Sequence, residues 1–273
     1  MFFNKKRKAQ AIYYLDKLQE NYQDLFHEPM QKSIFTEADI QTIEKELGYK
    51  IPKPYIDFLQ SYQLPESFTV SVSFCGDYAN CYEPEQEDDL FVTLEMEWYT
   101  ALSGDVRSFL SAVQKEDMPL GGTEDSFLDA GFLKVAEFEG YIVFLDLVTG
   151  EVIHIYHEAI YDMSIVDGID VSDYKAVRVY LSDFVLCKDF YDFLRLVCTK
   201  DIYDEDCLKF KTIAEIEAEE SNYTQPSIEE QNEIKEKAIE QVMNEQNMSR
   251  EDAIQYLADL VQITVEDFNR DMK

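Results

Sequence analysis

Residues 35–63, FTEADIQTIEKELGYKIPKPYIDFLQSYQ, predict two short helices joined by a proline turn. Thr36 and Asp39 have the spacing of a capping box, in which a hydroxyl and a carboxylate each accept a hydrogen bond from a backbone amide at the helix start. Gly48 predicts a left-handed helix end, and Pro52 prevents the first helix from continuing. Periodicity alone indicates no more than an ordinary helical hairpin.

Apolar and alternating runs further along the chain predict a sheet. In residues 68–74 every second residue is apolar, which is typical of a strand with one buried face. Runs separated by close turns predict an antiparallel meander over residues 132–138, 141–147 and 152–156. Val177, Val179 and Leu181 predict one more strand, whereas residues 91–98 fit either a strand or a helix.

Helical spacing of apolar residues predicts further helices over residues 1–30, 105–113 and 190–197. The hydrophobic fraction of 46% and the aromatic fraction of 14% are sufficient for a packed core. At 273 residues, the chain is long enough for one large domain or for a domain with an appendage. The expected fold is therefore α+β, with a central, mainly antiparallel sheet flanked by helices and an added C-terminal helical segment.

The amino-acid sequence of the opening hairpin resembles the signature of the SUKH superfamily. This superfamily includes fungal cell-wall regulators of the Smi and Knr type and many bacterial immunity proteins. The matching positions are Ile40, Ile43, Glu44, Leu47, Gly48, Ile51, Pro52, Tyr55, Phe58 and Leu59. A second region, YIVFLDLVTGEVIHIYHE at residues 141–158, matches at Leu145, Asp146, Gly150, Val152, Tyr156 and His157. Together with Asp192-Phe193-Leu194, the resemblance covers about residues 34–200 and implies a SUKH-like fold.

Three segments are expected: an N-terminal helix at 1–33, a SUKH-like domain at 34–203 and an acidic helical appendage at 204–273. The appendage holds 19 acidic and 7 basic residues, a net charge of −12. After an expected linker at 221–227, its predicted helices cover residues 228–244 and 249–261, with a last turn from Thr264. Ser249 with Asp252, and Thr264 with Asp267, repeat the capping-box spacing. Its apolar stripe packs either on the domain or on a partner.

Charge indicates the class of partner. The chain has 56 acidic and 24 basic residues, which gives a net charge of −32. This charge disfavours nucleic acid and anionic membrane surfaces, because both are polyanions. It favours a basic protein partner, although solubility alone is an equally good interpretation. No secretory signal or membrane-spanning run is visible and none of the five cysteines forms a CxxC pair, so a reducing cytoplasm is the expected compartment.

Residues with catalytic or metal-binding chemistry form no recognisable site in the sequence. His154 and His157 point to opposite faces of an expected strand, so they do not share a metal ion. Cys75 and Cys81 bracket a turn, but no second pair of zinc ligands follows nearby. Asp146 precedes a turn and is better explained by turn chemistry than as a catalytic base. Because nucleophile-elbow, P-loop and dinucleotide-binding motifs are also missing, we expect no metal, no cofactor and no enzymatic activity.

The resemblance implies a binding protein, and the charge adds a basic partner. The first hypothesis is a cytoplasmic immunity protein that sequesters a cognate toxin, for example a nuclease whose cleft attracts nucleic acid. The expected contacts are acidic residues with two tyrosine anchors: Tyr78, Tyr82, Glu83, Glu85, Glu87, Asp88, Asp89, Glu124 and Asp125. A solvated loop without a partner is the other interpretation of this segment. The alternative function is an intracellular regulatory scaffold that binds partner proteins through the C-terminal helices.

Overall fold

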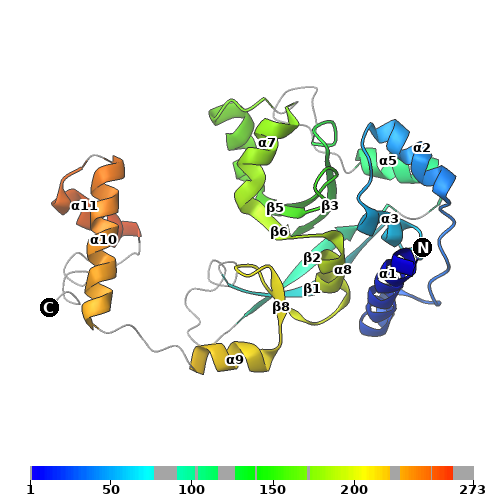
Figure 1. Ribbon diagram of the computed structural model, residues 1–273, viewed down its shortest axis with the longest axis horizontal. Coiled ribbons are helices and arrows are strands. Elements are labelled where there is room, and N and C mark those ends of the chain that lie inside the picture. The colour runs from blue at the N-terminus through cyan, green and yellow to red at the C-terminus, as the bar shows by residue number, and fades with distance from the viewer. Residues whose placement is uncertain are drawn as a thin grey trace. The chain divides into compact units, whose positions relative to one another are not determined.

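The structure is a computed structural model that describes residues 2–76, 91–101, 104–115, 127–138, 140–170, 173–221, 228–246 and 248–260. The chain forms two compact units, residues 1–216 and 217–273. The first unit contains the sheet and most of the helices, and the second contains the C-terminal helices (Figure 1).

An eight-stranded sheet lies at the centre of the first unit. Its strands are β1 (Ser67–Cys75), β2 (Val92–Tyr99), β3 (Phe132–Phe138), β4 (Tyr141–Asp146), β5 (Val152–Tyr156), β6 (Val185–Cys187), β7 (Ile202–Asp204) and β8 (Lys209–Lys211). They are ordered β6-β5-β4-β3-β2-β1-β7-β8, and neighbouring strands are antiparallel except for the parallel pair β1 and β7. The predicted α+β fold with a mainly antiparallel sheet is confirmed.

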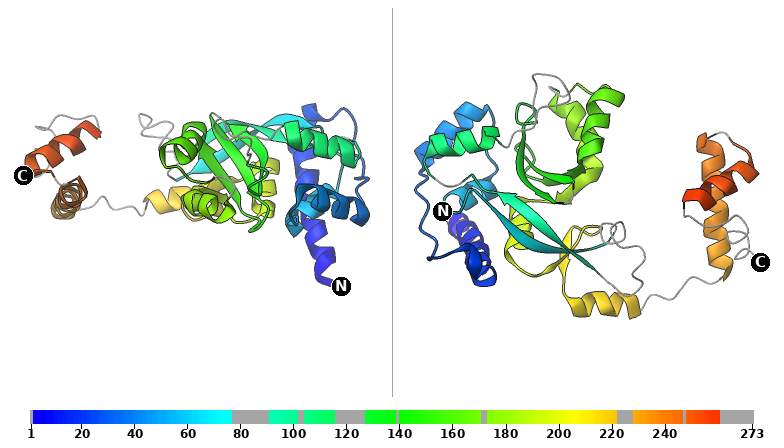
Figure 2. Two further views of the ribbon diagram at one scale, coloured as in Figure 1. Left: turned by 90° about the horizontal axis from the view of Figure 1, so that it is seen from above. Right: turned by 180° about the vertical axis from the view of Figure 1, so that it is seen from behind.

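Helices cover both faces of this curled sheet (Figures 1 and 2). The described helical elements of the first unit are α1 (Phe2–Asn21), η1 (Gln23–Leu25), α2 (Glu37–Leu47), α3 (Lys53–Leu59), α5 (Val106–Lys115), α6 (His157–Tyr161), η2 (Asp162–Val166), α7 (Tyr174–Tyr180), η3 (Leu181–Phe184), α8 (Phe190–Cys198) and the start of α9 (Ile213–Ser221). Helices α1, α3 and α8 pack together on one face, over the larger core. The segment α6–η2–α7 covers β3, β4 and β5 on the other face, over a second core.

Aromatic rings join the layers of the larger core. Phe58 of α3 stacks on Trp98 of β2, with ring centroids 5.5 Å apart. Phe193 of α8 meets the same indole edge-on at 5.8 Å. All three side chains are fully buried. The ambiguous segment at 91–98 is thus strand β2, because Leu94, Met96 and Trp98 share the buried face, which is the two-residue period of a strand.

The strand predicted from Val177, Val179 and Leu181 is wrong, because these residues lie in α7 and η3. Asp173 caps α7 by accepting a hydrogen bond from the Lys175 amide. Val177 and Leu181 are buried four residues apart, whereas Val179 between them is 74% exposed. A strand would have placed all three side chains on one face, so burial follows the helical period instead.

The opening hairpin forms as predicted. The Asp39 amide donates to the Thr36 hydroxyl at 3.3 Å, and the Thr36 amide donates to the Asp39 carboxylate at 2.8 Å, which completes the capping box. Gly48 ends α2 with a left-handed φ of 75°. The Glu44 carboxylate accepts a hydrogen bond from the Ile51 amide at 3.2 Å, so this residue fastens the turn between the two helices.

Two close contacts join this hairpin to the segments that flank β3 and β4. The Tyr49 hydroxyl donates to the Asp129 carbonyl at 2.6 Å, and its ring lies where a Cβ on Gly131 would come within 2.9 Å. Pro52 lies 3.4 Å from the place that a Cβ on Gly150 would occupy. The two regions that carry the SUKH resemblance are therefore in contact with each other in the folded chain.

Asp146 organises the turn between β4 and β5, as the sequence predicted. Its fully buried carboxylate accepts hydrogen bonds from the amides of Val148 at 2.8 Å and Thr149 at 3.1 Å. The same carboxylate accepts from the Tyr174 hydroxyl at 3.0 Å and lies 3.2 Å from Nε of Arg178. Since Tyr174 and Arg178 belong to α7, one carboxylate holds both the turn and the helix that covers the second core.

The described residues of the second unit include a helical pair, α10 (Ile228–Gln246) and α11 (Arg250–Leu260). Ile239 of α10 and the small residues Ala253 and Ala258 of α11 are fully buried together. At the capping box predicted for Ser249, the Asp252 amide donates to the Ser249 hydroxyl at 3.2 Å, which is the N-cap bond. The same hydroxyl donates to the Asp252 carboxylate at 2.7 Å. Of the linker predicted at 221–227, Ser221 is the last residue of α9, whereas residues 222–227 and the predicted last turn from Thr264 lie outside the described residues.

Replacing Gly131 by Ala tests the contact between the hairpin and the sheet. Both Gly131 (φ 90°) and the control Gly168 (φ 62°) have left-handed backbones, so an added Cβ costs about 1–2 kcal/mol at either position. Only Gly131→Ala also displaces the Tyr49 ring and its hydrogen bond, which adds about 1 kcal/mol. Urea unfolding followed by the fluorescence of Trp98, the single tryptophan, should show the larger loss for Gly131→Ala. Equal losses for both variants would contradict this account of the contact.

Candidate functional site

The residues predicted to bind a partner lie outside the described residues. Tyr78, Tyr82, Glu83, Glu85, Glu87, Asp88 and Asp89 fall within 77–90, and Glu124 and Asp125 fall within 116–126. Their role stays a prediction. The described residues on either side of each segment nevertheless show where the ends of that segment lie.

The flanks of segment 77–90 lie at one end of β1 and β2. Cys75 and Phe91 pack there against Ile202 of β7 and Ile216 of α9. A Cβ on Gly76 would come within 2.9 Å of the Asp206 carboxylate, so the turn between β7 and β8 lies against this point. The described flank of the predicted acidic loop at Gly76 therefore lies beside the Asp206 carboxylate.

The flank of Glu124 and Asp125 lies at the opposite end of the sheet. Phe127 accepts a hydrogen bond through its carbonyl from the amide of Phe132, the first residue of β3. The flanks of segment 77–90 lie beyond the last residue of β3, Phe138, because β2 extends past that residue as far as Val92. The seven residues of β3 extend about 20 Å. The structure thus separates the flanks of the two predicted acidic groups.

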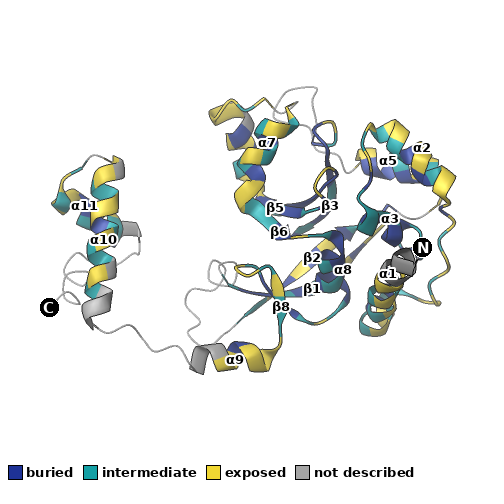
Figure 3. Ribbon diagram, in the orientation of Figure 1, coloured by how far each residue is buried: buried dark blue, intermediate teal, exposed yellow. Residues whose placement is uncertain are grey.

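A row of exposed carboxylates lies on the polar face of β2 and β3. Exposed and buried residues alternate along β2 (Figure 3). Glu95 and Glu97 are exposed there, and Glu137 of β3, whose side chain is 44% exposed, is paired directly with Glu97. Like charges directly opposite each other destabilise a sheet. Lys134 contacts Glu137 at 2.9 Å and offsets part of this repulsion. The Ser71 hydroxyl donates to Glu95 at 2.7 Å. This face thus presents acid and hydroxyl groups.

His154 occupies an aromatic cluster near the same end of the sheet as segment 77–90. Its ring stacks against Tyr141 at 5.5 Å and Phe138 at 6.5 Å, and its side chain is only 14% exposed. Burial lowers the pKa of His154 to about 4. The imidazole is therefore neutral at pH 7, so its 4.0 Å approach to the Glu205 carboxylate is not an ion pair at that pH.

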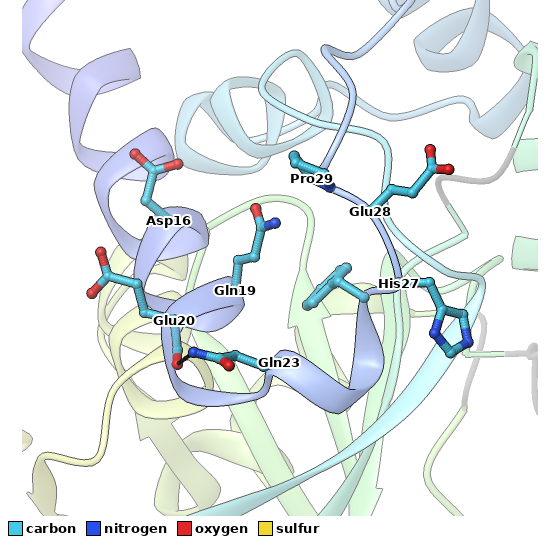
Figure 4. A pocket seen from close by; sticks show the side chains of 8 residues that line it. Asp16, Gln19, Glu20, Gln23, His27, Glu28 and Pro29 are labelled. Atoms are coloured by element: carbon cyan, nitrogen blue, oxygen red, sulfur yellow. Dashed lines mark hydrogen bonds between the residues drawn. The ribbon is translucent and has the colours of Figure 1, made fainter.

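A cleft of about 560 Å³ opens between α1 and the segment that follows η1 (Figure 4). It is lined by Asp16, Gln19, Glu20, Gln23, Phe26, His27, Glu28 and Pro29. The Met30 amide donates to Gln19 at 3.4 Å at its edge, and Lys17 neutralises part of its charge by pairing with Glu20 at 2.5 Å. The lining holds no hydroxyl or thiol nucleophile next to a base, so the cleft has the chemistry of a polar surface groove.

The buried carboxylates of the described chain serve the fold. Asp57 accepts from the Tyr191 hydroxyl at 2.6 Å and pairs with Lys53, which joins α3 to α8. Asp204 accepts from the Cys207 amide at 3.0 Å and pairs with Lys211, which fixes the turn between β7 and β8. Within the described ranges, no three His, Cys, Asp or Glu residues are grouped to hold a metal ion. The exposed carboxylates of the described residues can accept hydrogen bonds from cationic groups.

Comparison with known protein families matches residues 34–195, more than half of the chain, to the SMI1/KNR4 family (SUKH-1). The chain belongs to this family. The match begins just before the hairpin and ends within α8, so α1, β7, β8 and the second unit lie outside it. No curated protein and no solved structure shows a significant match. The SUKH family includes immunity proteins, and the resemblance predicted from the sequence is confirmed.

The acidic face that this SUKH-1 protein presents on β2 and β3 was not predicted from the sequence. The signal was present as the alternation of Thr93, Glu95 and Glu97 with Leu94, Met96 and Trp98. This alternation does not by itself identify the acidic face, because residues 91–98 fit either a strand or a helix. The pairing of Glu97 with Glu137 could not be read from the sequence, since it depends on the register of two strands that are separated by 32 residues. In the described part of the chain, none of the helices is long and apolar enough to cross a membrane.

Acidification should destabilise this protein through His154. In the unfolded chain histidine binds a proton near pH 6.5, whereas in the folded protein His154 does so only near pH 4. The unfolded state therefore binds more protons in this window, and stability falls by roughly 2–3 kcal/mol between pH 7 and 4.5. His154→Phe, which keeps the aromatic stacking, should remove most of this loss in urea unfolding followed by Trp98 fluorescence. The control His27→Phe changes an exposed histidine and should keep the loss, and equal pH dependence in all three proteins would contradict the assignment.

Proposed function

We propose that this SUKH-1 protein is a non-enzymatic cytoplasmic immunity protein that binds and neutralises a basic toxin, such as a nuclease. The observation that carries the proposal is the row of Glu95, Glu97 and Glu137, because direct pairing of two of these carboxylates costs stability that a cationic partner would recover. The net charge of −32 extends the same potential over the whole chain.

A nuclease toxin must attract a polyanion, so its cleft carries cations that an acidic protein can occupy. The acidic row and the flanks of segment 77–90 belong to neighbouring strands, β1, β2 and β3. We therefore propose that the toxin binds the polar face of β2 and β3 together with segment 77–90. In that segment the steering charges would be Glu83, Glu85, Glu87, Asp88 and Asp89, and the anchors would be Tyr78 and Tyr82. Glu124 and Asp125 would then contribute to long-range attraction rather than to the same contact, because their flank lies at the other end of β3.

Mixing the pure protein with the toxin domain encoded by the neighbouring gene tests the proposal directly. A complex should form at micromolar concentration in moderate salt, and toxin activity should fall in proportion to the complex. The absence of any complex under these conditions would contradict the immunity function.

Charge reversal in segment 77–90 should slow association. Electrostatic steering acts mainly on the association rate, so Glu85→Lys, Glu87→Lys and Asp88→Lys combined should reduce that rate by about tenfold or more at low salt. Stopped-flow mixing with the toxin domain measures it. A matched control is the triple reversal Glu233→Lys, Glu236→Lys and Glu240→Lys in α10, which changes the net charge equally. Unchanged rates in the first variant would remove the loop from the interface.

Deletion of residues 222–273 distinguishes immunity from the scaffold alternative. The apolar stripe of α10 and α11 is used inside the helical pair, where Ile239, Ala253 and Ala258 are buried. We therefore expect the truncated protein to bind and neutralise the toxin domain with an affinity within about threefold of the full chain. Loss of partner binding together with retained Trp98 fluorescence of the folded first unit would favour a scaffold that docks through these helices.

A further inference from the structure

An exposed apolar ridge runs along α6 and η2. Tyr161 is 57% exposed, Ile165 49% and Val166 68%, although all three belong to the segment that covers the second core. Neighbouring Ile160 and Met163 are buried in that core. The segment therefore presents apolar side chains on both of its sides, whereas a surface helix normally carries polar residues on the outer side.

The backbone explains why these three residues share the outer side. η2 is a π-helical turn, in which the Asp167 amide donates to the Asp162 carbonyl five residues earlier at 2.9 Å. With four to five residues per turn, positions 161, 165 and 166 return to one side, which would not hold for a segment of extended chain. Such turns are rare in proteins and occur frequently at functional sites.

The surroundings of the ridge carry one sign of charge. Glu158, Asp162, Asp167 and Asp170 are exposed next to it in the sequence. No Lys or Arg occurs anywhere between Lys134 and Lys175. An apolar centre with a charged rim is the composition of a protein-binding surface, and here the rim accepts only cations.

We infer that the ridge of Tyr161, Ile165 and Val166 docks a helix of a partner protein, whose apolar face is flanked by Lys and Arg side chains. The ten residues of α6 and η2 extend about 15 Å, which matches roughly three turns of a partner helix. Apolar residues of the partner cover the ridge, and its cations pair with the surrounding carboxylates. The identification of this partner as the toxin rests on the proposed function.

Binding of the toxin domain by ridge variants is the first arm of the test. Ile165→Asp places a charge in the centre of the contact and should weaken binding at least tenfold. Ile34→Asp is the matched control, because Ile34 is similarly exposed, at 53%, precedes α2 in the chain, and receives the same change of charge. The control should remain within about twofold of the wild-type protein. Equal effects of the two substitutions would overturn the inference while leaving the proposed function intact.

A model peptide separates failure of the surface from failure of the proposed function. The probe is an 18-residue amphipathic peptide of leucine and lysine with leucines at helical spacing, and a scrambled peptide of equal composition controls for charge alone. The wild-type protein should bind the amphipathic peptide at least fivefold more tightly than Ile165→Asp does, and Ile34→Asp should match the wild-type protein. If the toxin domain fails to bind but this difference in peptide affinity is observed, the ridge is a docking surface and the proposed immunity function is wrong. If the difference is missing, the inference is wrong.

A second copy of the chain could cover the ridge instead of a partner helix. Sedimentation of the wild-type protein and of Ile165→Asp over a range of concentrations tests this alternative. Both proteins should sediment as the same species. A wild-type dimer that Ile165→Asp converts to monomer would show that self-association covers the ridge, and it would overturn docking of a cationic partner.

Discussion

The contact between the opening hairpin and the turn after β4 is the constraint on which the rest of the structure depends. Pro52 lies against Gly150, and the Tyr49 ring lies over Gly131, so segments about 80–100 residues apart meet at these two glycines. At Gly131 an added Cβ would come within 2.9 Å of the Tyr49 ring, so this contact requires glycine. From this junction Asp146 reaches Tyr174 and Arg178 of α7, while Asp57 of α3 reaches Tyr191 of α8. Asp146 thus connects α7 to the sheet, and Asp57 joins two helices on the opposite face. Each buried carboxylate is satisfied by partners that the fold brings to it.

Local chemistry predicted the elements whose decisive contacts are near in sequence. The capping box of Thr36, the left-handed end at Gly48 and the turn role of Asp146 all involve partners within a few residues, so the sequence contains the whole interaction. The three-residue strands β6, β7 and β8 are too short for a periodic signal and exist because distant strands offer them hydrogen bonds. The strand predicted around Val177 was wrong for a related reason. Its β-branched residues favour strands, but Val177 and Leu181 are buried in the second core at the spacing of a helix.

The candidate site was also predictable from the sequence only in part. Net charge and family resemblance were visible in the sequence and indicated a basic protein partner for a member of the SMI1/KNR4 family. The pairing of Glu97 with Glu137 and the outer side of Ile165 and Val166 depend on strand register and on a π-helical turn, neither of which has a sequence signal. Both features cost stability in the isolated chain, through like-charge repulsion and through exposed apolar area. Under the proposed function, a partner with cations around an apolar helix face would relieve both costs.

Hydrogen–deuterium exchange of the full chain with and without the toxin domain tests most directly where recognition lies. The account predicts slower exchange in the complex for residues 77–99 and 157–170, with the hairpin at 35–63 and the helical pair at 228–260 unchanged. The hairpin is expected to stay unchanged because its contacts already serve the framework. Protection confined to the hairpin or to the helical pair would contradict the account, since recognition would then lie on the framework or on the second unit.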